Sequence, residues 1–235
     1  MVIPTYNEAE NISKMLPRLR ELVPEVEILV VDDSSPDGTA EIVERLAAAD
    51  DAIFLLRRAA KSGLGGAYRA GFRWGLDRGY DHFVEMDADF SHDPAALPTL
   101  LEAAQAGAGL VIGSRYVPGG QIPKWSWYRA LLSRGGNLYA SALLGLKVKD
   151  ATAGFRVYAG AALEAIGFEA VTLDGYGFQI EMTDRARQAG VSIVEVPISF
   201  IDREVGESKM SSSIIVEALW MVTERGIARR FGRSG

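Results

Sequence analysis

The segment Asp87-Ala88-Asp89 combines the residue types and spacing with the clearest chemical meaning in this sequence. It directly follows an apolar run at residues 83–86, which is typical of a strand. Residues two apart in an extended chain point to the same side, so the two carboxylates would repel each other unless a cation lay between them. Hard divalent ions such as Mg²⁺ and Mn²⁺ bind carboxylate and phosphate oxygens together. The pattern therefore indicates a metal site formed by Asp87 and Asp89.

Asp93 is a nearby carboxylate with a simpler interpretation. It stands directly before Pro94, and this arrangement is typical of the N-terminus of a helix. Capping of the same helix by Asp89 is the structural alternative to the metal site. We assign the cap to Asp93 and the metal to the earlier pair.

Two adjacent carboxylates, Asp32 and Asp33, follow another apolar run at residues 28–31. The next residues form a turn sequence, and turn or cap chemistry is sufficient to explain Asp37. It explains two neighbouring carboxylates at a buried strand end less well, because like charges repel. We expect at least one of the pair to bind a ligand.

The end of the first apolar run combines a capping signal with an aromatic residue. Thr5 and Glu8 match a capping box, so a structural role for Thr5 is as good an interpretation as a functional one. Tyr6 differs, because an aromatic ring at a strand end beside a crevice can stack on or flank a nucleotide base.

Basic residues in the expected loops provide the complementary charge. Arg115 follows the apolar run at residues 110–113 and would face a ligand crevice, whereas a solvated surface position is the usual interpretation of a lone arginine. Further cations stand at Arg129, Arg203 and Lys209. Two or three such cations around a metal suit a diphosphate and a second phosphate.

The glycine-rich segment at residues 61–66 matches neither the Walker pattern nor Gly-x-Gly-x-x-Gly, since Tyr68 stands at the third glycine position. We interpret it as close backbone packing at the start of a helix. Binding of a dinucleotide cofactor is therefore not expected.

Short apolar runs alternate with helical patterns in the first half of the chain. Strands are predicted at residues 2–5, 28–31, 53–56, 83–86 and 110–113, and helices begin near residues 7, 38, 65 and 94. This rhythm predicts an α/β fold with a doubly wound, mostly parallel sheet and flanking helices. Ligands bind beyond the carboxyl ends of the strands in such sheets, where the candidate residues stand.

The second half is less regular. Helices are predicted at residues 125–144, 178–189 and 211–231, and strands at 156–158 and 193–201. No repeat or linker interrupts the sequence, so we expect a single domain.

Composition excludes several function classes. The 235 residues carry a net charge of −6, which argues against nucleic acid as a partner. The chain has no cysteine and only two histidines, His82 and His92, so thiolate and multi-histidine metal sites are excluded. The start does not resemble a signal peptide, and no run is long and apolar enough to span a bilayer.

Two segments have an open interpretation as membrane-contacting surfaces. The last predicted helix carries an apolar face and is followed by an arginine-rich tail at residues 225–235, which is either a solvated end or an interfacial helix on anionic lipid. Trp125, Trp127 and Tyr128 lie beside basic residues and are either interfacial or core.

These motifs together resemble the inverting family 2 glycosyltransferases with a GT-A fold. The resemblance rests on residues 2–11, 30–38 and 86–89. Four later segments indicate a smaller group within this family: Gly-Ser-Arg-Tyr at 113–116, Asp-Ala-Thr-Ala-Gly-Phe at 150–155, Gly-Tyr-Gly-Phe-Gln-Ile-Glu at 175–181 and the segment 200–210. These later motifs are similar to those of dolichol- or polyprenol-phosphate mannose synthases, and the similarity covers nearly the whole chain.

The resemblance implies a role for each matching position. Nucleotide-sugar binding falls to Pro4, Tyr6, Glu8, Val31, Asp33, Asp87, Ala88, Asp89, Arg115, Arg203 and Lys209. Catalysis falls to Asp87, Asp89 and Arg115, with Asp89 the main ligand of Mg²⁺ or Mn²⁺ and Asp87 assisting. Arg129 and Ser114 match positions near the acceptor phosphate. The residues after Asp89 depart from the Leu-Gln of several relatives, so a glutamine contact to the metal is not carried over.

The resemblance also implies a reaction and a location. The expected reaction is transfer of mannose from GDP-mannose to a polyprenyl or dolichyl monophosphate with inversion, at the cytoplasmic face of a membrane. Docking would be peripheral, or would depend on an anchoring partner or a fused segment. The alternatives are a UDP-glucose-dependent polyprenyl-phosphate glucosyltransferase and a catalytically silent nucleotide-sugar-binding or membrane-adaptor module.

Within the single domain, 1–235, the resemblance implies that different parts of the chain bind the donor and the acceptor. Residues 1–116 would form the nucleotide-sugar half and residues 117–210 the acceptor half. Residues 211–235 would form the C-terminal amphipathic helix.

Overall fold

The computed structural model describes residues 1–61, 63–201, 212–230 and 232. Its strands are β1 (Val2–Thr5), β2 (Ile28–Asp32), β3 (Ile53–Arg57), β4 (His82–Glu85), β5 (Leu110–Ser114), β6 (Arg156–Ala159) and β7 (Ile193–Pro197). Its α-helices are α1 (Ala9–Leu22), α2 (Thr39–Ala47), α3 (Leu64–Leu76), α4 (Leu97–Gln105), α5 (Trp127–Leu144), α6 (Gly160–Ile166), α7 (Gly175–Gln188) and α8 (Ser212–Arg230). Two 3₁₀ turns, η1 (Pro94–Ala96) and η2 (Phe168–Ala170), complete the set.

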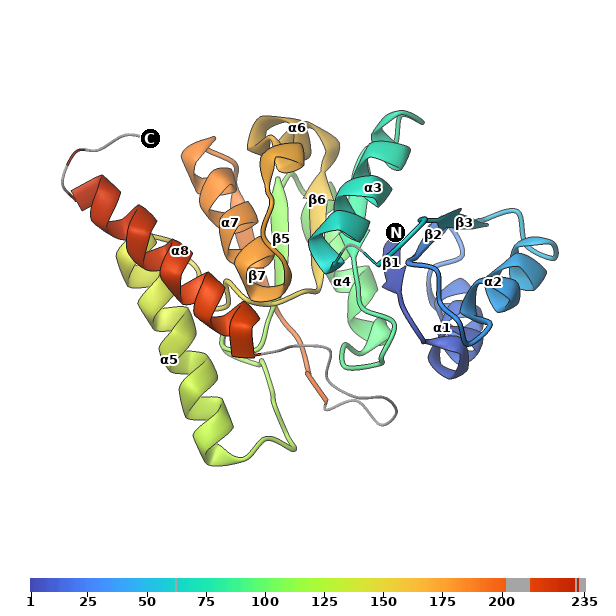
Figure 1. The fold of residues 1–235 in the computed structure, drawn as a ribbon, viewed down its shortest axis with the longest axis horizontal. Helices are drawn as coiled ribbons and strands as arrows, with labels where there is room; N and C mark the ends of the chain where they lie inside the picture. The colour runs from blue at the N-terminus through green and yellow to red at the C-terminus, as the bar shows by residue number, and fades with distance from the viewer. Residues whose placement is uncertain (62, 202–211, 231, 233–235) are drawn as a thin grey trace.

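The strands form one sheet in the order β3-β2-β1-β4-β6-β5-β7. Neighbouring strands are parallel except at β6, which runs antiparallel to both β4 and β5. The predicted α/β fold with a mostly parallel sheet and flanking helices is therefore confirmed (Figure 1). Because β4 pairs with β6, the sheet continues from the predicted nucleotide-sugar half into the predicted acceptor half; that functional division stays a prediction.

Two hydrophobic cores cover the two faces of the sheet. Alternation along a strand sends Val2 to one core and Ile3 to the other. The first core is completed by α3, α6 and α7, and the second by α1 and α4. Both faces are thus buried, which explains why the central strands are apolar runs rather than alternating ones.

The sequence placed most elements within a few residues of their observed bounds. It missed α6, which directly follows β6, and it extended β7 beyond its end at Pro197. The prediction that Thr5 and Glu8 form a capping box is wrong. Thr5 lies in β1 and its Oγ1 donates to Asp32 Oδ1 at 2.8 Å, while Glu8 occupies the N-cap of α1 without a side-chain cap bond.

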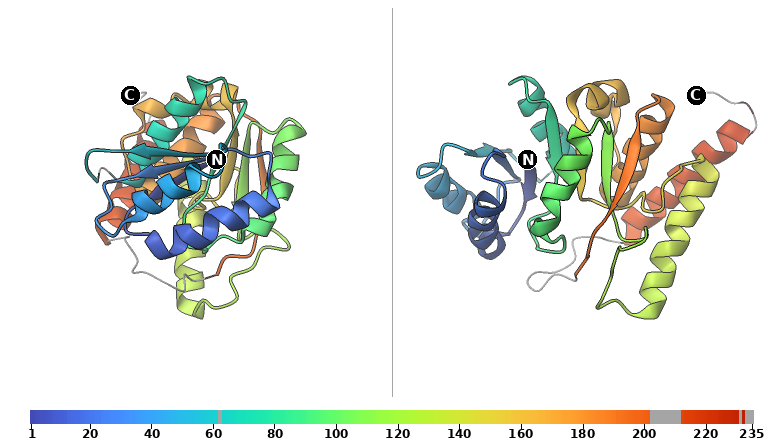
Figure 2. Two further views of the ribbon diagram at one scale, coloured as in Figure 1. Left: turned by 90° about the vertical axis from the view of Figure 1, so that its right-hand side faces the viewer. Right: turned by 180° about the vertical axis from the view of Figure 1, so that it is seen from behind.

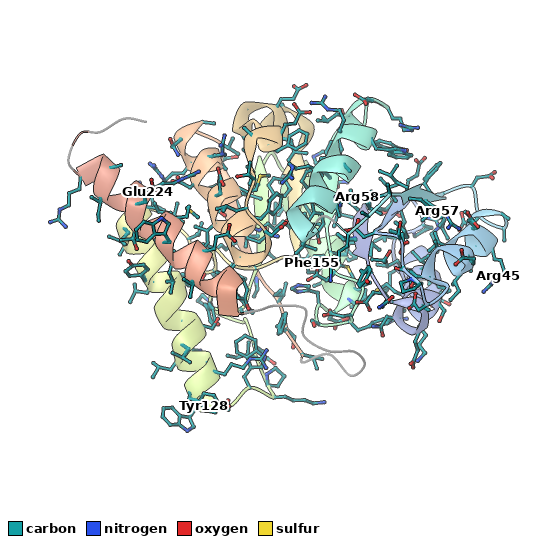
Figure 3. The ribbon with its side chains drawn as sticks, viewed as in Figure 1. Arg45, Arg57, Arg58, Tyr128, Phe155 and Glu224 are labelled. Carbon is teal, nitrogen blue, oxygen red and sulfur yellow. The ribbon has the colours of Figure 1, made fainter. Side chains whose placement is uncertain are left out.

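The helices α5 and α8 pack against each other at the far end of the molecule from α1 and α2, as two views show (Figures 1 and 2). Tyr128 lies on the first turn of α5, at the end that points away from the sheet (Figure 3). Among the described residues, no helix is both long and apolar enough to cross a bilayer.

Candidate active site

A cavity of about 280 Å³ opens beyond the carboxyl ends of β1, β2 and β4. This is the position at which open α/β sheets bind ligands. The sequence had predicted seven of the residues that line it: Pro4, Tyr6, Glu8, Asp33, Asp87, Ala88 and Asp89. Further lining comes from Thr5, Lys61, Gly63, Leu64, Ala67, Asp174 and Gly175.

The Asp87-Ala88-Asp89 segment leaves β4 and forms one wall of this cavity. Tyr68 from α3 donates its hydroxyl to Asp87 Oδ1 at 3.1 Å. Asp89 is 8% exposed, and its Oδ1 accepts the backbone N–H of Ser91 at 3.0 Å. Burial raises the pKa of Tyr68 well above its ordinary value, and the nearby carboxylates of Asp87 and Glu85 add to the effect. Tyr68 therefore stays protonated and acts as a donor to Asp87.

Asp93 lies outside this wall and has the capping role that the sequence predicted. Its carboxylate accepts the backbone N–H of Ala95 at 2.9 Å at the start of η1. The cap and the candidate metal ligands are thus different residues.

The structure separates the roles of Asp32 and Asp33. Asp32 accepts bonds from Thr5 Oγ1 and from both the backbone and the hydroxyl of Ser35, so it organises the turn. Asp33 lines the cavity, and its Oδ1 lies 3.0 Å from an Nη1 atom of Arg58, a residue labelled in Figure 3. Asp33 is therefore the member of the pair that lies at the cavity, and its role in ligand binding stays a prediction.

Lys61 and Asp174 are cavity residues that the sequence reasoning missed. The Lys61 ammonium lies 4.3 Å from the centre of the Tyr6 ring, so a cation and an aromatic ring meet at the cavity. Asp174 accepts the backbone N–H of Gly65 at 2.9 Å and thereby joins the starts of α3 and α7. The glycine-rich pattern did indicate close packing, and a Cβ on Gly65 would lie 2.6 Å from the Leu173 carbonyl oxygen. The position of Asp174 before α7 gave no comparable signal.

Arg115 does not line the cavity. Its guanidinium is 4% exposed and binds Asp150 at two points, with Nε 2.7 Å from Oδ2 and Nη2 2.6 Å from Oδ1. Nη2 also donates to Thr152 Oγ1 at 2.8 Å. Burial alone lowers the pKa of a guanidinium, but the bonds and charge of Asp150 outweigh it, so the pKa of Arg115 is raised. The expectation that Arg115 faces the crevice is therefore corrected: an internal acid holds it.

The other predicted residues have varied positions. Val31 is a buried residue of the first core, and Ser114 is buried at the end of β5, where its Oγ accepts the Tyr116 N–H at 3.3 Å. Arg129 is exposed on α5, with its guanidinium 4.1 Å from the centre of the Trp125 ring. None of these three lines the cavity. Arg203 and Lys209 lie outside the described residues, and the contacts expected for all five stay predictions.

Two titratable groups are buried beside the Asp87-Ala88-Asp89 wall. Burial raises the pKa of Glu85 to about 8, against the opposing influence of Arg156 and Gln179. Burial lowers the pKa of His92 to about 4, although the Asp89 charge favours the protonated form. Burial therefore favours the uncharged form of both groups.

Asp87 and Asp89 are suited to hold a divalent cation with help from a ligand. The described residues contain no group of three or more histidine, aspartate or glutamate side chains able to hold a metal ion. The remaining ligands would then be oxygens of a bound diphosphate and water, which is the usual arrangement for Mg²⁺ with phosphorylated substrates. The donor set of two carboxylates at an open cavity fits such an ion.

Comparison with known proteins gives relatives over the whole chain. Residues 1–167 match the family model "Glycosyl transferase family 2". An undecaprenyl-phosphate mannosyltransferase of Micrococcus luteus is 54% identical over 98% of this chain and 94% of its own. A polyprenol monophosphomannose synthase of Mycolicibacterium smegmatis is 52% identical over 100% of this chain and 89% of its own.

Solved structures share the fold at low sequence identity. The glucosyl-3-phosphoglycerate synthase of Mycobacterium tuberculosis, in complex with Mn²⁺ and UDP-glucose, has a TM-score of 0.66 at 19% identity and covers 100% of this chain and 79% of its own. A mannosyltransferase of Pyrobaculum calidifontis, in complex with GDP-Man and Mn²⁺, has a TM-score of 0.61 at 17% identity, over 100% of this chain and 64% of its own. These two structures show the shared fold, while the family match and the two relatives above 50% identity establish that this chain belongs to glycosyl transferase family 2.

Proposed function

We propose that this protein transfers mannose from GDP-mannose to a polyprenyl monophosphate, with inversion at the anomeric carbon. The observation that carries the proposal is the meeting of Asp87 and Asp89 with Tyr6, Glu8 and Asp33 around one cavity. Carboxylates for a metal–diphosphate and an aromatic ring for a base are what a nucleotide sugar requires. Two relatives more than 50% identical, both named for mannose transfer to a polyprenol or its phosphate, support this donor and acceptor.

The chemical step is a single displacement. An acceptor phosphate oxygen attacks the anomeric carbon, the bond from that carbon to the donor's diphosphate oxygen breaks, and GDP leaves with the electron pair. A phosphate monoester has a second pKa of about 6, so this nucleophile is already largely ionised at neutral pH. The step therefore needs no strong general base, which agrees with a chain that contains only two histidines.

Mg²⁺ or Mn²⁺, when bound, would offset charge that develops on the departing diphosphate. Asp89 and Asp87 are the residues proposed to hold it. Tyr68 fixes one oxygen of Asp87 by its hydrogen bond, and the backbone N–H of Ser91 fixes one oxygen of Asp89. Arg203 and Lys209 are proposed to contact the donor phosphates, and Arg129 the acceptor phosphate.

We further propose that the protein acts peripherally at the cytoplasmic face of a membrane. Large apolar side chains are exposed on α5 and α8, notably Trp127 at 78% and Trp220 at 71%. Leu131, Leu132, Leu138 and Val216 are each more than 60% exposed. An exposed apolar surface of this kind suits contact with the lipid that carries the acceptor phosphate.

The test is sugar transfer from radiolabelled GDP-mannose or UDP-glucose to a short polyprenyl phosphate, with Mn²⁺, with Mg²⁺ and with a chelator. Metal-dependent mannolipid is the expected product. Glucolipid alone would replace the proposed donor, and tight nucleotide binding without any product would favour a silent binding module.

A further inference from the structure

Gln179 is a buried polar side chain that the reaction scheme above leaves without a role. It is 2% exposed, and neither its Oε1 nor its Nε2 makes a hydrogen bond of good geometry in the described part of the chain, although the amide lies close enough to Glu85 to lower the pKa of that carboxyl. An unsatisfied buried amide costs free energy, so its retention needs an explanation.

The backbone of Gln179 is held firmly in place. Its carbonyl oxygen accepts bonds from Arg156 Nη1 at 3.1 Å and from Thr183 Oγ1 at 2.8 Å. Arg156 is fully buried. The position of this residue is therefore built into the packing between α7 and β6.

Helix spacing places Gln179 on the face of α7 that carries a cavity residue. Gly175, four residues earlier on α7, lies on the same helix face and lines the cavity. Long side chains of helices point back towards the N-terminus over the preceding turn. Gln179 itself is buried and does not line the cavity, but Gly175 places no side chain between them.

Three polar side chains converge at one point beside Gly154. A Cβ placed on this glycine would lie 3.7 Å from Gln179 Nε2, 3.8 Å from Asp87 Oδ2 and 4.0 Å from His92 Nε2. His92 is also buried, and its Nδ1 has no partner in the described part of the chain. Asp87 joins this cluster to the wall of the cavity. We name Gln179, His92, Asp87 and Gly154 the polar floor.

We propose that the polar floor binds hydroxyl groups of the hexose that is transferred, with Gln179 as the main specificity-determining residue. An amide supplies both a donor and an acceptor, and sugar hydroxyls need both. The group attached to a diphosphate held at Asp87 and Asp89 would lie beside Asp87, which is itself a member of the floor. The inference rests on the proposed function, since it requires a nucleotide-sugar donor.

The test compares the affinity for GDP-mannose with the affinity for GDP, both measured by calorimetry with Mn²⁺. Only GDP-mannose carries the hexose, so Gln179→Leu is expected to weaken its binding about tenfold while GDP binding stays unchanged. Leucine is apolar and of similar size, which preserves the packing of α7. Gln188→Leu, on the exposed side of the same helix, is the matched control and should change neither affinity.

Gly154→Ala provides a second variant that does not depend on tolerance of a substitution in α7. Its methyl group would make ordinary van der Waals contacts with the three polar side chains, so the fold should be retained while space for a hydroxyl is lost. The same selective loss of GDP-mannose affinity is expected. Thermal melts verify that each variant is folded.

Three outcomes would overturn the inference, and they are distinguishable from failure of the proposed function. If both variants bind GDP-mannose like the wild type, the floor does not contact the sugar. If their affinities for GDP and for GDP-mannose fall equally, the floor supports the structure of the cavity but does not bind the sugar. If the wild-type protein binds and transfers no nucleotide sugar, the proposed function fails and the inference falls with it.

Discussion

Arg115 and Asp150 form a buried ion pair in which the guanidinium and the carboxylate meet at two points, at 2.7 and 2.6 Å. Asp150 also accepts the backbone N–H of Arg115 at 2.9 Å. Asp150 is itself held by Glu195, whose carboxylate accepts the backbone N–H of Asp150 at 3.0 Å. The pair therefore fastens the chain after β5 to the loop that precedes β6 and to β7.

Asp150→Asn is expected to destabilise the fold by about 3–5 kcal/mol, because it leaves the buried charge of Arg115 without its counterion. Urea unfolding measures the change in the free energy of unfolding. Glu10→Gln is the control, since it breaks the exposed pair with Lys14 and should cost less than about 1 kcal/mol. A cost for Asp150→Asn as small as that of the control would show that the pair is not structural.

Asp89→Ala is expected to lower metal-dependent transfer by about 100-fold or more, as loss of a group that stabilises developing charge typically does. The assay is the mannolipid assay described above, with Mn²⁺ titrated. Asp93→Ala is the matched control: it removes the η1 cap, at about 1 kcal/mol of stability, and should leave transfer intact. Equal activity of the two variants would remove Asp89 from the metal site.

Gly65→Ala is expected to destabilise the protein by about 1–3 kcal/mol, because the new methyl group would collide with the Leu173 carbonyl oxygen and the Phe178 ring. Gly135→Ala is the control on α5, where a Cβ meets nothing within 4 Å. It should stabilise the helix by about 0.5–1 kcal/mol. Thermal melts of both variants test whether close packing at the start of α3 is the reason for the glycine there.

Trp127→Ser and Trp220→Ser are each expected to weaken binding to anionic vesicles about tenfold, since each removes a large apolar side chain from the proposed membrane-contacting surface. Flotation with vesicles of phosphatidylglycerol and phosphatidylcholine measures the partitioning. Val194→Ser is the control, because Val194 is 41% exposed on β7 rather than on α5 or α8. If both tryptophan variants partition like the wild type, the exposed faces of α5 and α8 are ordinary solvated surfaces.

Asp37→Ala is expected to lower stability at pH 7 and to lose this effect in acid. Partial burial raises the pKa of Asp37, but its bonds with Thr39 and with the backbone of Ala9 outweigh this, so the pKa is lowered overall. A carboxyl with a lowered pKa stabilises the fold above its unfolded value, near 3.9, and the contribution is lost as the pH falls through the folded value. Urea unfolding at pH 7 and pH 3 should therefore show a gap that narrows in acid; a constant gap would contradict this assignment.

Much of the fold followed from patterns within short stretches of sequence. Apolar runs separated by amphipathic segments determine a sheet covered on both faces, and that topology places strand-end residues on one edge. The sequence could therefore predict four of the cavity residues, because each follows a strand: Tyr6, Asp33, Asp87 and Asp89. The rule that ligands bind beyond strand ends needs no knowledge of contacts between distant residues.

Contacts between residues far apart in the chain were decided only by the tertiary structure. Asp174 meets Gly65 across 109 positions because α7 packs beside α3, and Arg115 meets Asp150 across 35 because their loops are adjacent. Sequence placed Arg115 in the crevice, since a charge after a strand has no visible internal partner until packing supplies one. The convergence of Gln179 and His92 on Gly154 has the same origin: the residues come from separate elements, and their local patterns carry no information about which buried polar groups will face each other.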